Sequence, residues 1–497
     1  MTPRPGLADA EHLFSRLRNL YGHLVAERTL GVEVDLDAVS DRRREWRRIK
    51  EELGDSLPAA DSRLLDLMSA TLRELEDWLS LGDEDPVVDL RRDTLSAYTG
   101  VAAGVPLGDG TLDRLSIFEL LETASDEPAR RDAFMAMAPI WEAVDGDGGD
   151  DSPYRRLLPA SASSWGVSGF PLHLGAAHLG VDPARIEADL VDILRAFRRL
   201  MPGRTIEPWD FRFLCGAAER EVEVPLASLQ EHNDRHLASL GAPGRPEVRY
   251  HIMPEPERAP LALAFTLAES IGWEEAGEWH PAAPVVFAWY ATGGLGHLSE
   301  LVHESGHALH YLATRARPAE FDWPLEALPF VEAVGELLGW NVSEPTFVAA
   351  TFGASISDEE ARLYRYGPLM LDVLWTLFEV ELHRHPDRRP NDVWAQLSED
   401  HLGVAGHPEW SWWAVRGQLI ESPGYLSNYA LGGIVVAALR ERMATKRPQW
   451  WLGDPSWYAY ASEHLLRFGA TGSSSDIIEG FLGEPLTTRA ILSDLEG

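Results

Sequence analysis

The sequence predicts a mainly α-helical protein with one small β-sheet. Apolar residues recur at spacings of three and four along most of the 497-residue chain, which is the period of a helix with one buried face. Strand-like alternation is nearly absent before residue 200 and is confined to a short region near residues 245–295. The hydrophobic share of 45% and the charged share of 25% are those of an ordinary globular protein with a sizeable core.

The helical pattern begins near residue 8 and holds to about residue 81. Two turn-rich pieces, 104–110 and 145–153, interrupt the helices that follow, and the second is rich in Gly, Asp and Ser. We expect 145–153 to be an exposed loop or a boundary between subdomains. The helical period of the first stretch is carried by Leu13, Leu17, Leu20 and Leu24, and then by Leu64, Leu65, Met68, Leu72 and Leu75.

Two segments between residues 245 and 295 read as strands. Residues 247–252 and 284–292 are rich in β-branched and aromatic side chains, and Pro and Gly bound them. After Gly296 the helical period returns and continues to the end of the chain. A small sheet is therefore expected directly before the helix that begins near Gly296.

The charge balance excludes some classes of function. Lys and Arg total 44 against 79 Asp and Glu, so the formal net charge is -35. Such a surface repels phosphate backbones and anionic membranes, which argues against nucleic acid and membrane partners. The acidity serves solubility in one interpretation. In the other it also favours cationic or neutral substrates.

The cellular compartment is predicted from the lack of a recognisable targeting signal. The first residues lack the apolar core of a signal peptide, and apolar runs such as 431–439 are far shorter than the ~20 residues that span a bilayer. The single cysteine, Cys215, allows no intrachain disulfide. A cytoplasmic location is therefore expected.

The most informative motif is His303-Glu304-Ser305-Gly306-His307. Residues four apart lie on the same face of a helix, so His303 and His307 can present their imidazoles to one Zn²⁺. Glu304 then reaches a water molecule bound to the metal. The alternative is a pair of helix histidines that only pack or face solvent, and a third ligand is needed to choose between them.

Glu332 and Glu336 supply that further evidence. They stand four apart on an otherwise apolar helix, where a buried carboxylate requires a partner. Catalytic zinc sites commonly use three protein ligands and leave a fourth position for water. The sequence therefore predicts one Zn²⁺ per chain, with His303, His307 and Glu332 as ligands and Glu336 as acceptor for the N–H of a ligating histidine.

These residues resemble the gluzincin zinc metallopeptidases. The segment 301–310 is similar to the thimet oligopeptidase and oligopeptidase F family (M3), and Glu332 sits at the spacing of that family's third ligand. Residues 332–336 resemble the angiotensin-converting-enzyme family (M2), and 424–432 resemble the M32 carboxypeptidases. Residues 472–483 resemble the terminal segment of M3 enzymes. The resemblance covers roughly residues 200–497.

The resemblance implies a large helical peptidase fold with a small sheet next to the HExxH helix and a deep substrate channel. Residues 201–497 would form the catalytic zinc metallopeptidase region, and residues 1–200 a helical wall of the channel. Glu304 would act as general base. A tyrosine would stabilise the negatively charged intermediate, and Tyr425 and Tyr429 are both candidates.

The substrate is expected to lie as an added strand on a sheet edge. Residues 284–292 are the natural edge because they directly precede the HExxH helix, so Tyr290 and Ala291 are predicted to bind substrate. Arg416 is the last residue of segment 412–416, which resembles a segment of the M2 family. It could hold a substrate carboxylate, or it could equally anchor the fold.

The favoured function is zinc-dependent hydrolysis of short peptides by an oligopeptidase. A metallocarboxypeptidase or dipeptidyl carboxypeptidase stays open, because either would need a cation to fix the peptide's terminal carboxylate. A catalytically silent peptide-binding protein on the same scaffold and a metal hydrolase acting on other substrates also stay open. The sequence makes no prediction of oligomeric state.

Overall fold

The computed structural model describes residues 6–54, 58–79, 86–245, 247–252 and 264–497, and these are mainly helical. The predicted mainly α fold is confirmed. Helix ends follow ordinary capping rules. At the start of the longest helix, Ser357 and Glu360 bond reciprocally to each other's backbone N–H, which stabilises the first turn.

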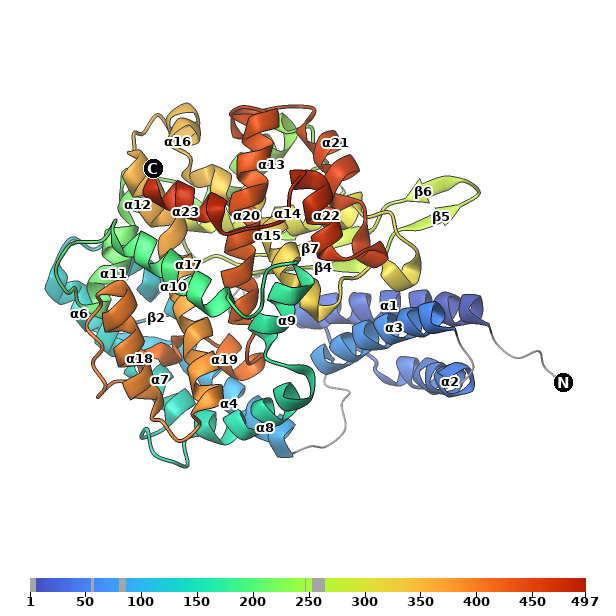
Figure 1. Ribbon diagram of the computed structural model, residues 1–497, viewed down its shortest axis with the longest axis horizontal. Coiled ribbons are helices and arrows are strands. Elements are labelled where there is room, and N and C mark those ends of the chain that lie inside the picture. Colours follow the sequence, from blue (N-terminus) through green and yellow to red (C-terminus); the bar gives the residue numbers. More distant parts are fainter. Residues whose placement is uncertain (1–5, 55–57, 80–85, 246, 253–263) are drawn as a thin grey trace.

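The first three helices form a core of their own. They are α1 (Leu7–Thr29), α2 (Asp37–Gly54) and α3 (Ala59–Trp78), and they project from the main body in Figure 1. Phe14, Trp46 and Met68 meet in this core, at 6% exposure or less. Helix α1 also packs against the sheet, so this unit is joined to the strand layer.

The next part of the chain surrounds one end of the main body. The region 104–110, expected as a turn, forms most of a hairpin of β1 (Val105–Leu107) and β2 (Gly110–Leu112), while the loop expected at 145–153 lies between α7 and α8. The helices are α4 (Pro86–Ala102), α5 (Arg114–Thr123), α6 (Glu127–Ala136), α7 (Ala138–Asp145), α8 (Pro153–Ser168), α9 (Pro171–His178), α10 (Ile186–Arg198), α11 (Pro208–Cys215), α12 (Ala217–Glu221) and α13 (Leu229–Ser239).

The small sheet has the order β3-β7-β4. Strand β7 (Ala283–Phe287) pairs parallel with β3 (Arg249–His251) and antiparallel with β4 (Phe265–Ser270). Both predicted strands are present, but each is shorter than its segment. The prediction that 284–292 forms the sheet edge is wrong, because β7 is the central strand. A further hairpin, β5 (Trp273–Glu275) and β6 (Glu278–His280), follows β4.

The second half of the chain supplies the helices around the HExxH motif. The two that matter most, α14 (Leu295–Ala313) and α15 (Leu328–Gly339), lie against each other, and α20 (Leu426–Lys446) covers the other side of α15. The others are α16 (Pro345–Phe352), α17 (Asp358–Arg384), α18 (Pro390–Leu397), α19 (Gln418–Glu421), α21 (Trp457–Ala461), α22 (Ser474–Leu482) and α23 (Arg489–Glu496).

Glycines allow these three helices to approach closely. A Cβ on Gly306 of α14 would lie 3.0 Å from the Cα of Gly335 on α15. A Cβ on Gly432 of α20 would lie 3.2 Å from the carbonyl oxygen of Pro329 on α15. The central helix α15 is therefore held between α14 and α20 with almost no side-chain layer at these crossings.

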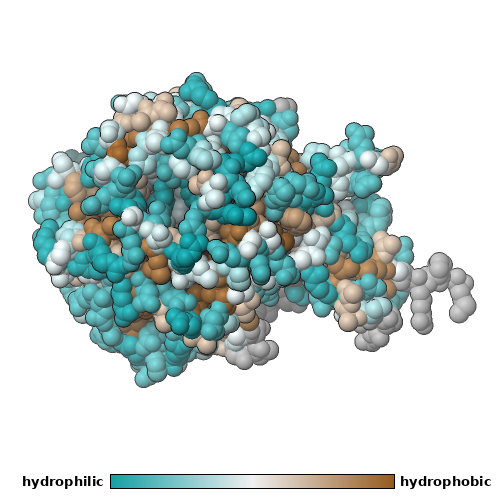
Figure 2. All heavy atoms as spheres, turned by 45° about the horizontal axis from the view of Figure 1, so that its top comes forward, coloured by the Kyte–Doolittle hydropathy of each residue, from teal (hydrophilic) through white to brown (hydrophobic). Residues whose placement is uncertain are grey.

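The main hydrophobic core is one cluster of buried side chains, which come from positions between Tyr98 and Leu495. Residues on both sides of position 200 contribute to it. The predicted division at residue 200 stays a prediction. Hydrophilic residues cover most of the face in Figure 2. Within the described ranges, no helix combines the length and apolar character needed to cross a membrane.

Candidate metal centre

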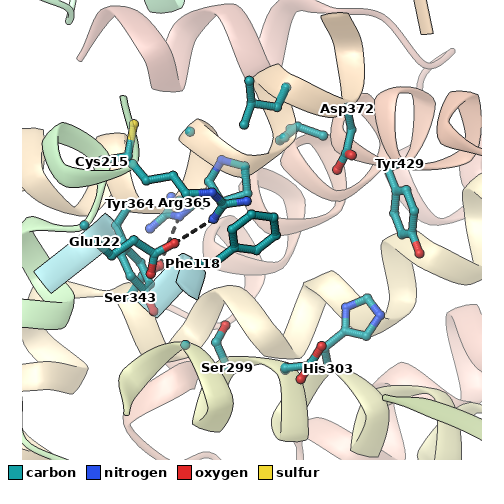
Figure 3. Close-up of a pocket in the computed structure, with 18 of the residues that line it drawn as sticks. Phe118, Glu122, Cys215, Ser299, His303, Ser343, Tyr364, Arg365, Asp372 and Tyr429 are labelled. Carbon is teal, nitrogen blue, oxygen red and sulfur yellow. Dashed lines mark hydrogen bonds and ion pairs between the residues drawn. The ribbon is translucent and has the colours of Figure 1, made fainter. Parts of the chain in front are cut away.

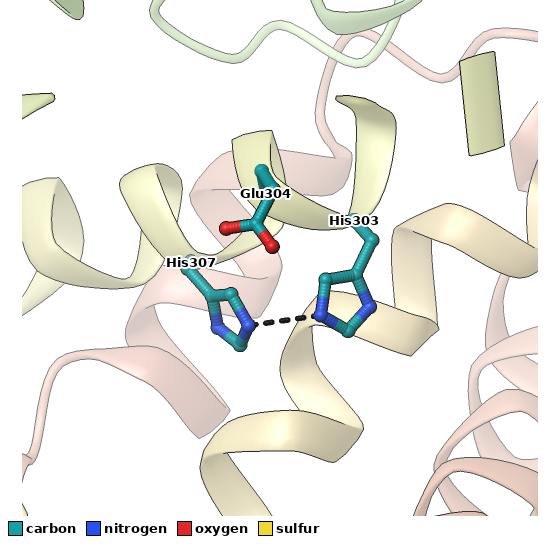
Figure 4. A group of neighbouring side chains, drawn as sticks. All are labelled: His303, Glu304 and His307. Carbon is teal, nitrogen blue, oxygen red and sulfur yellow. Dashed lines mark hydrogen bonds between the residues drawn. The ribbon is translucent and has the colours of Figure 1, made fainter. Parts of the chain in front are cut away.

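His303 and His307 stand one turn apart on α14 and point to the same place (Figure 4). Their Nε2 atoms are 3.0 Å apart, and both rings are largely buried. Together with the Glu304 carboxylate they form a group of potential ligand atoms within 4.8 Å of one another. The helical spacing predicted from the sequence therefore brings the motif together as expected.

Glu332 reaches the same point from α15. Its Oε2 lies 3.6 Å from Nε2 of His303 and 3.8 Å from Nε2 of His307, and the residue is 6% exposed. In a tetrahedral zinc site with bonds near 2 Å, ligand atoms are about 3.3 Å apart. The three atoms are spaced almost as such a site requires, so these residues fit a zinc ion without large rearrangement.

Glu336 lies behind His303, one turn beyond Glu332. Its Oε1 is 3.4 Å from Nδ1 of His303, on the side of the ring opposite the site. A carboxylate there fixes the proton on Nδ1 and leaves Nε2 to face a metal. Gly335 makes room for this arrangement, because a Cβ at that position would lie 2.7 to 2.9 Å from the atoms of the His303 ring.

The electrostatics of the two histidines are unequal. Burial lowers the pKa of His303, but the carboxylates of Glu336 and Glu332 outweigh it and raise that pKa well above its ordinary value. Burial, together with the charge on His303, lowers the pKa of His307 to about 3. One positive charge is therefore favoured on this pair of histidines, on His303, which lies beside Glu332 and Glu336.

Glu304 is buried beside the histidines at 6% exposure. Burial raises the pKa of this carboxyl to about 7, which the neighbouring His303 and a hydrogen bond from Thr266 only partly offset. Oγ1 of Thr266, on strand β4, donates to Oε2 of Glu304 at 2.7 Å. A carboxyl group with a pKa near neutrality is suited to both accepting and returning a proton.

The two candidate tyrosines occupy different positions. Oη of Tyr425 donates to Oε1 of Glu332 at 2.6 Å, so it contacts the predicted third ligand directly. Tyr429 lies one turn further along α20, and the two ring centroids are 5.6 Å apart. The described residues that line the adjoining cavity include Tyr429 but not Tyr425.

That cavity has a volume of about 420 Å³ and opens beside His303. Figure 3 shows His303, Asp372 and Tyr429 towards one end, with Glu122 and Tyr364 towards the other. Among the described residues, its lining contains eight carboxyl side chains and four guanidinium groups. The acids are Glu119, Glu122, Glu219, Glu300, Glu304, Glu332, Glu336 and Asp372, and the arginines are Arg114, Arg212, Arg365 and Arg416.

Arg416 both anchors the fold and faces this cavity. Its Nη2 donates to Oδ1 of Asp372, on α17, at 2.7 Å, and its guanidinium lies 5.7 Å from the ring centroid of Tyr429. The Nε atom of Arg416 is buried and has no hydrogen-bond partner in the part of the chain that the structure describes. The guanidinium of Arg416 therefore has N–H donors that these contacts do not use, and the bond to Asp372 fixes its orientation.

Tyr290 and Ala291 do not lie on a sheet edge as predicted, and neither is among the described residues that line the cavity, although Tyr290 stacks on His297, which is. The backbone N–H of Tyr290 already donates to the carbonyl oxygen of Ile252 at 3.0 Å, and the side chain is 2% exposed. The predicted binding role of both residues depended on an edge strand at 284–292, so it loses its basis. Strand β4, which the sequence analysis missed, is the edge that touches Glu304.

Sequence reasoning also missed Thr266 and Asp372. Thr266 stands in an alanine- and leucine-rich stretch, 261–268, that lacks the β-branched signal of a strand. Asp372 lies in the middle of a 27-residue helix, where a single acid among apolar residues gives no indication of its partner. In the sequence, only the spacing of apolar residues along 358–384 could have indicated that Asp372 points inward.

Comparisons with known proteins support the architecture. No family model and no curated protein sequence matches the chain. A solved structure described as a candidate peptidase from Chlamydophila abortus matches with a TM-score of 0.59 at 15% identity, over 99% of this chain and 89% of that one. An M32 carboxypeptidase from Deinococcus radiodurans R1 matches with a TM-score of 0.52 at 14% identity, over 98% and 97%. The chain therefore shares the fold of these proteins over almost its whole length.

Proposed function

We propose that this protein is a zinc-dependent peptidase that cleaves short peptides. The observation that carries the proposal is the convergence of Nε2 of His303, Nε2 of His307 and Oε2 of Glu332 at separations of 3.0 to 3.8 Å. Glu304 stands beside them in a buried environment. A bound zinc ion would lower the pKa of a coordinated water and polarise the scissile carbonyl.

Glu304 has the position and protonation behaviour of a general base. It would take a proton from the attacking water and return it to the leaving amine. The hydrogen bond from Thr266 fixes one oxygen of the carboxylate and leaves the other for this transfer. The same hydroxyl lies 3.0 Å from the backbone carbonyl oxygen of Glu304, so Thr266 contacts both the side chain and the backbone of this residue.

The geometry favours different roles for the two tyrosines. Tyr429 lines the cavity, so its hydroxyl is the better placed to donate to the negatively charged oxygen that develops during hydrolysis. Tyr425 holds Glu332 through a 2.6 Å hydrogen bond and would orient that ligand. This assignment gives Tyr429 the role that the sequence left open between the two residues, and it gives Tyr425 a different role.

A peptide ligand suits the adjoining cavity. Its volume of about 420 Å³ lies in the range of small-molecule sites, which matches a few residues of a peptide rather than a folded protein. The M3-like segments of the sequence favour an oligopeptidase. An added substrate strand would have to pair with an edge strand, since β7 is paired on both sides, and β4 is the edge strand that contacts Glu304.

A carboxypeptidase is the second candidate, and Arg416 is the observation that favours it. Arg416 carries donors into the cavity beside His303 and is held by Asp372. A guanidinium in that position suits a terminal carboxylate, which it can bind through two hydrogen bonds. The fold shared with the Deinococcus radiodurans M32 carboxypeptidase is compatible with this candidate.

Mass spectrometry of products from a mixed peptide library would test the proposal. Cleavage should disappear after treatment with a chelator and return when zinc is restored. Cleavage that survives complete removal of the metal would contradict it. The two candidates separate on one peptide prepared with a free and an amidated C-terminus, because only a carboxypeptidase should lose activity on amidation.

A further inference from the structure

The segment between Arg416 and Gly424 is held at both ends by one helix. Asp372 and Glu379 stand seven residues apart on α17, which places them on the same face two turns apart. Asp372 accepts from Arg416 at 2.7 Å, and Glu379 accepts from the backbone N–H of Gly424 at 2.8 Å. The segment 416–424 leads directly into α20, which carries the tyrosines of the candidate site.

Glu379 is the more unusual of these two acids. It is 2% exposed, and among the described residues its hydrogen-bond partner is a backbone N–H rather than a basic side chain. Burial raises the pKa of Glu379 to about 8, partly offset by the bond from Gly424. Burying a carboxyl group without a cation is unfavourable, and an apolar residue would serve stability better. Its presence therefore calls for a role beyond filling the core.

Gly424 is fixed tightly around this contact. Its φ is +81°, in the region that favours glycine, and a Cβ there would lie 2.6 Å from Cγ of Pro171. Its carbonyl oxygen accepts from Oγ of Ser427 at 2.6 Å. The peptide groups on both sides of the Gly424 Cα are thus held, and Glu379 holds the N–H of Gly424 just before the 21-residue helix α20.

The residue after Gly424 is Tyr425, whose hydroxyl donates to Glu332 at 2.6 Å. A shift of the Gly424 peptide would move the Tyr425 backbone and lengthen that bond. We propose that Glu379 is a positioning residue which, through the Gly424 N–H, sets Tyr425 against the metal ligand Glu332. This inference rests on the proposed function, since it assigns Glu332 to the metal.

Zinc release to a chelator, measured together with peptide hydrolysis, tests the proposal. Glu379→Met removes the acceptor at similar length, and Tyr425→Phe removes the hydroxyl at the other end of the chain of contacts. Each should speed zinc release about tenfold, as loss of a group that orients a ligand does. The double variant should release zinc no faster than either single variant. In all three variants kcat should fall, while KM should stay within about twofold of the wild-type value.

Two further variants separate positioning from general damage. Glu379→Gln keeps an acceptor oxygen for Gly424 and should release zinc within about threefold of the wild-type rate. Glu381→Gln lies on the same helix, half-exposed and paired with Arg388, and should behave as wild type. If Glu379→Met does not fold, Gly424→Ala replaces it, because it displaces the same peptide while Glu379 stays in place.

The outcomes are distinct. Wild-type zinc release in Glu379→Met, or additive effects in the double variant, would overturn the inference alone. A wild-type protein that binds zinc but cleaves no peptide would overturn the proposed function, while the zinc-release comparison would still judge the role of Glu379. A wild-type protein that binds no zinc would overturn both.

Discussion

At the scale of single residues, the site depends on Gly335, which has no side chain. The His303 ring occupies the space that a side chain there would need, and Glu336 holds the ring from behind. The two glutamates and the glycine between them therefore act together. Glu332 offers the ligand, Gly335 leaves room for the imidazole and Glu336 sets its orientation.

Gly335→Ala should damage the metal centre more than the fold. The added Cβ would overlap the imidazole, so we expect zinc affinity to fall at least about tenfold. Zinc titration followed by thermal unfolding of the metal-free protein measures both effects. Gly480→Ala is the matched control, because a Cβ in that helix meets nothing within 4 Å and should stabilise slightly. Equal zinc affinity in the two variants would contradict this role of Gly335.

Local periodicity explains which residues could be predicted. His303 and His307, and Glu332 and Glu336, are pairs four apart on helices, so each pair shares a face whatever the tertiary fold. Thr266 and Asp372 reach the site from elements distant in sequence. Their contribution depends on how β4 and α17 are placed, which no local pattern contains.

At the scale of elements, α17 links the cavity to the start of α20. Its inner face presents Asp372 and Glu379 to the segment that precedes the tyrosines. The sequence predicted helical structure throughout this part of the chain, but not the bounds of α17 or which acids it buries. The sheet was predicted less well. Strand β4 was missed for lack of β-branched residues, and the edge was placed on β7 because position in the chain does not fix position in a sheet.

Glu379→Gln should change the pH dependence of stability. A carboxyl group whose pKa is raised to about 8 in the fold stabilises the protein while protonated, and this contribution is lost as pH rises from about 4.5 to about 8. The amide mimics the protonated form at every pH. Its advantage in the free energy of unfolding should therefore grow from pH 5 to pH 8 and then level off, reaching a few kcal/mol, roughly. Chemical unfolding at several pH values measures it, and a constant difference would contradict the buried, protonated state.

At the scale of the whole molecule, the fold class was predictable from the sequence, whereas the role of the protein's negative charge was left open. Helical periodicity predicted the mainly α architecture, and two β-branched and aromatic segments predicted the sheet next to the HExxH helix. The separate core of α1–α3 was not foreseen, because apolar periodicity identifies helices without showing which of them share a core. The formal net charge of -35 is matched locally by a cavity richer in carboxylates than in guanidinium groups.

Ionic strength should therefore affect substrates according to their charge. An acidic molecule attracts cationic peptides over a distance that salt shortens to about 10 Å at 0.1 M. We expect kcat/KM for a lysine-containing peptide to fall several-fold between low salt and 0.5 M salt. A neutral peptide of the same length should change little, and identical salt dependence for both would show that the acidity serves solubility alone.

The central claim is that a zinc ion on His303, His307 and Glu332 works with Glu304 to hydrolyse peptides. The most direct measurement compares zinc content and hydrolysis of a quenched peptide in the wild type and Glu304→Gln. We expect one zinc per chain in both proteins and a loss of kcat of about 10² to 10⁴ in the variant, the usual contribution of a general base. Equal rates in the two proteins, or hydrolysis by a wild type that contains no zinc, would contradict the account.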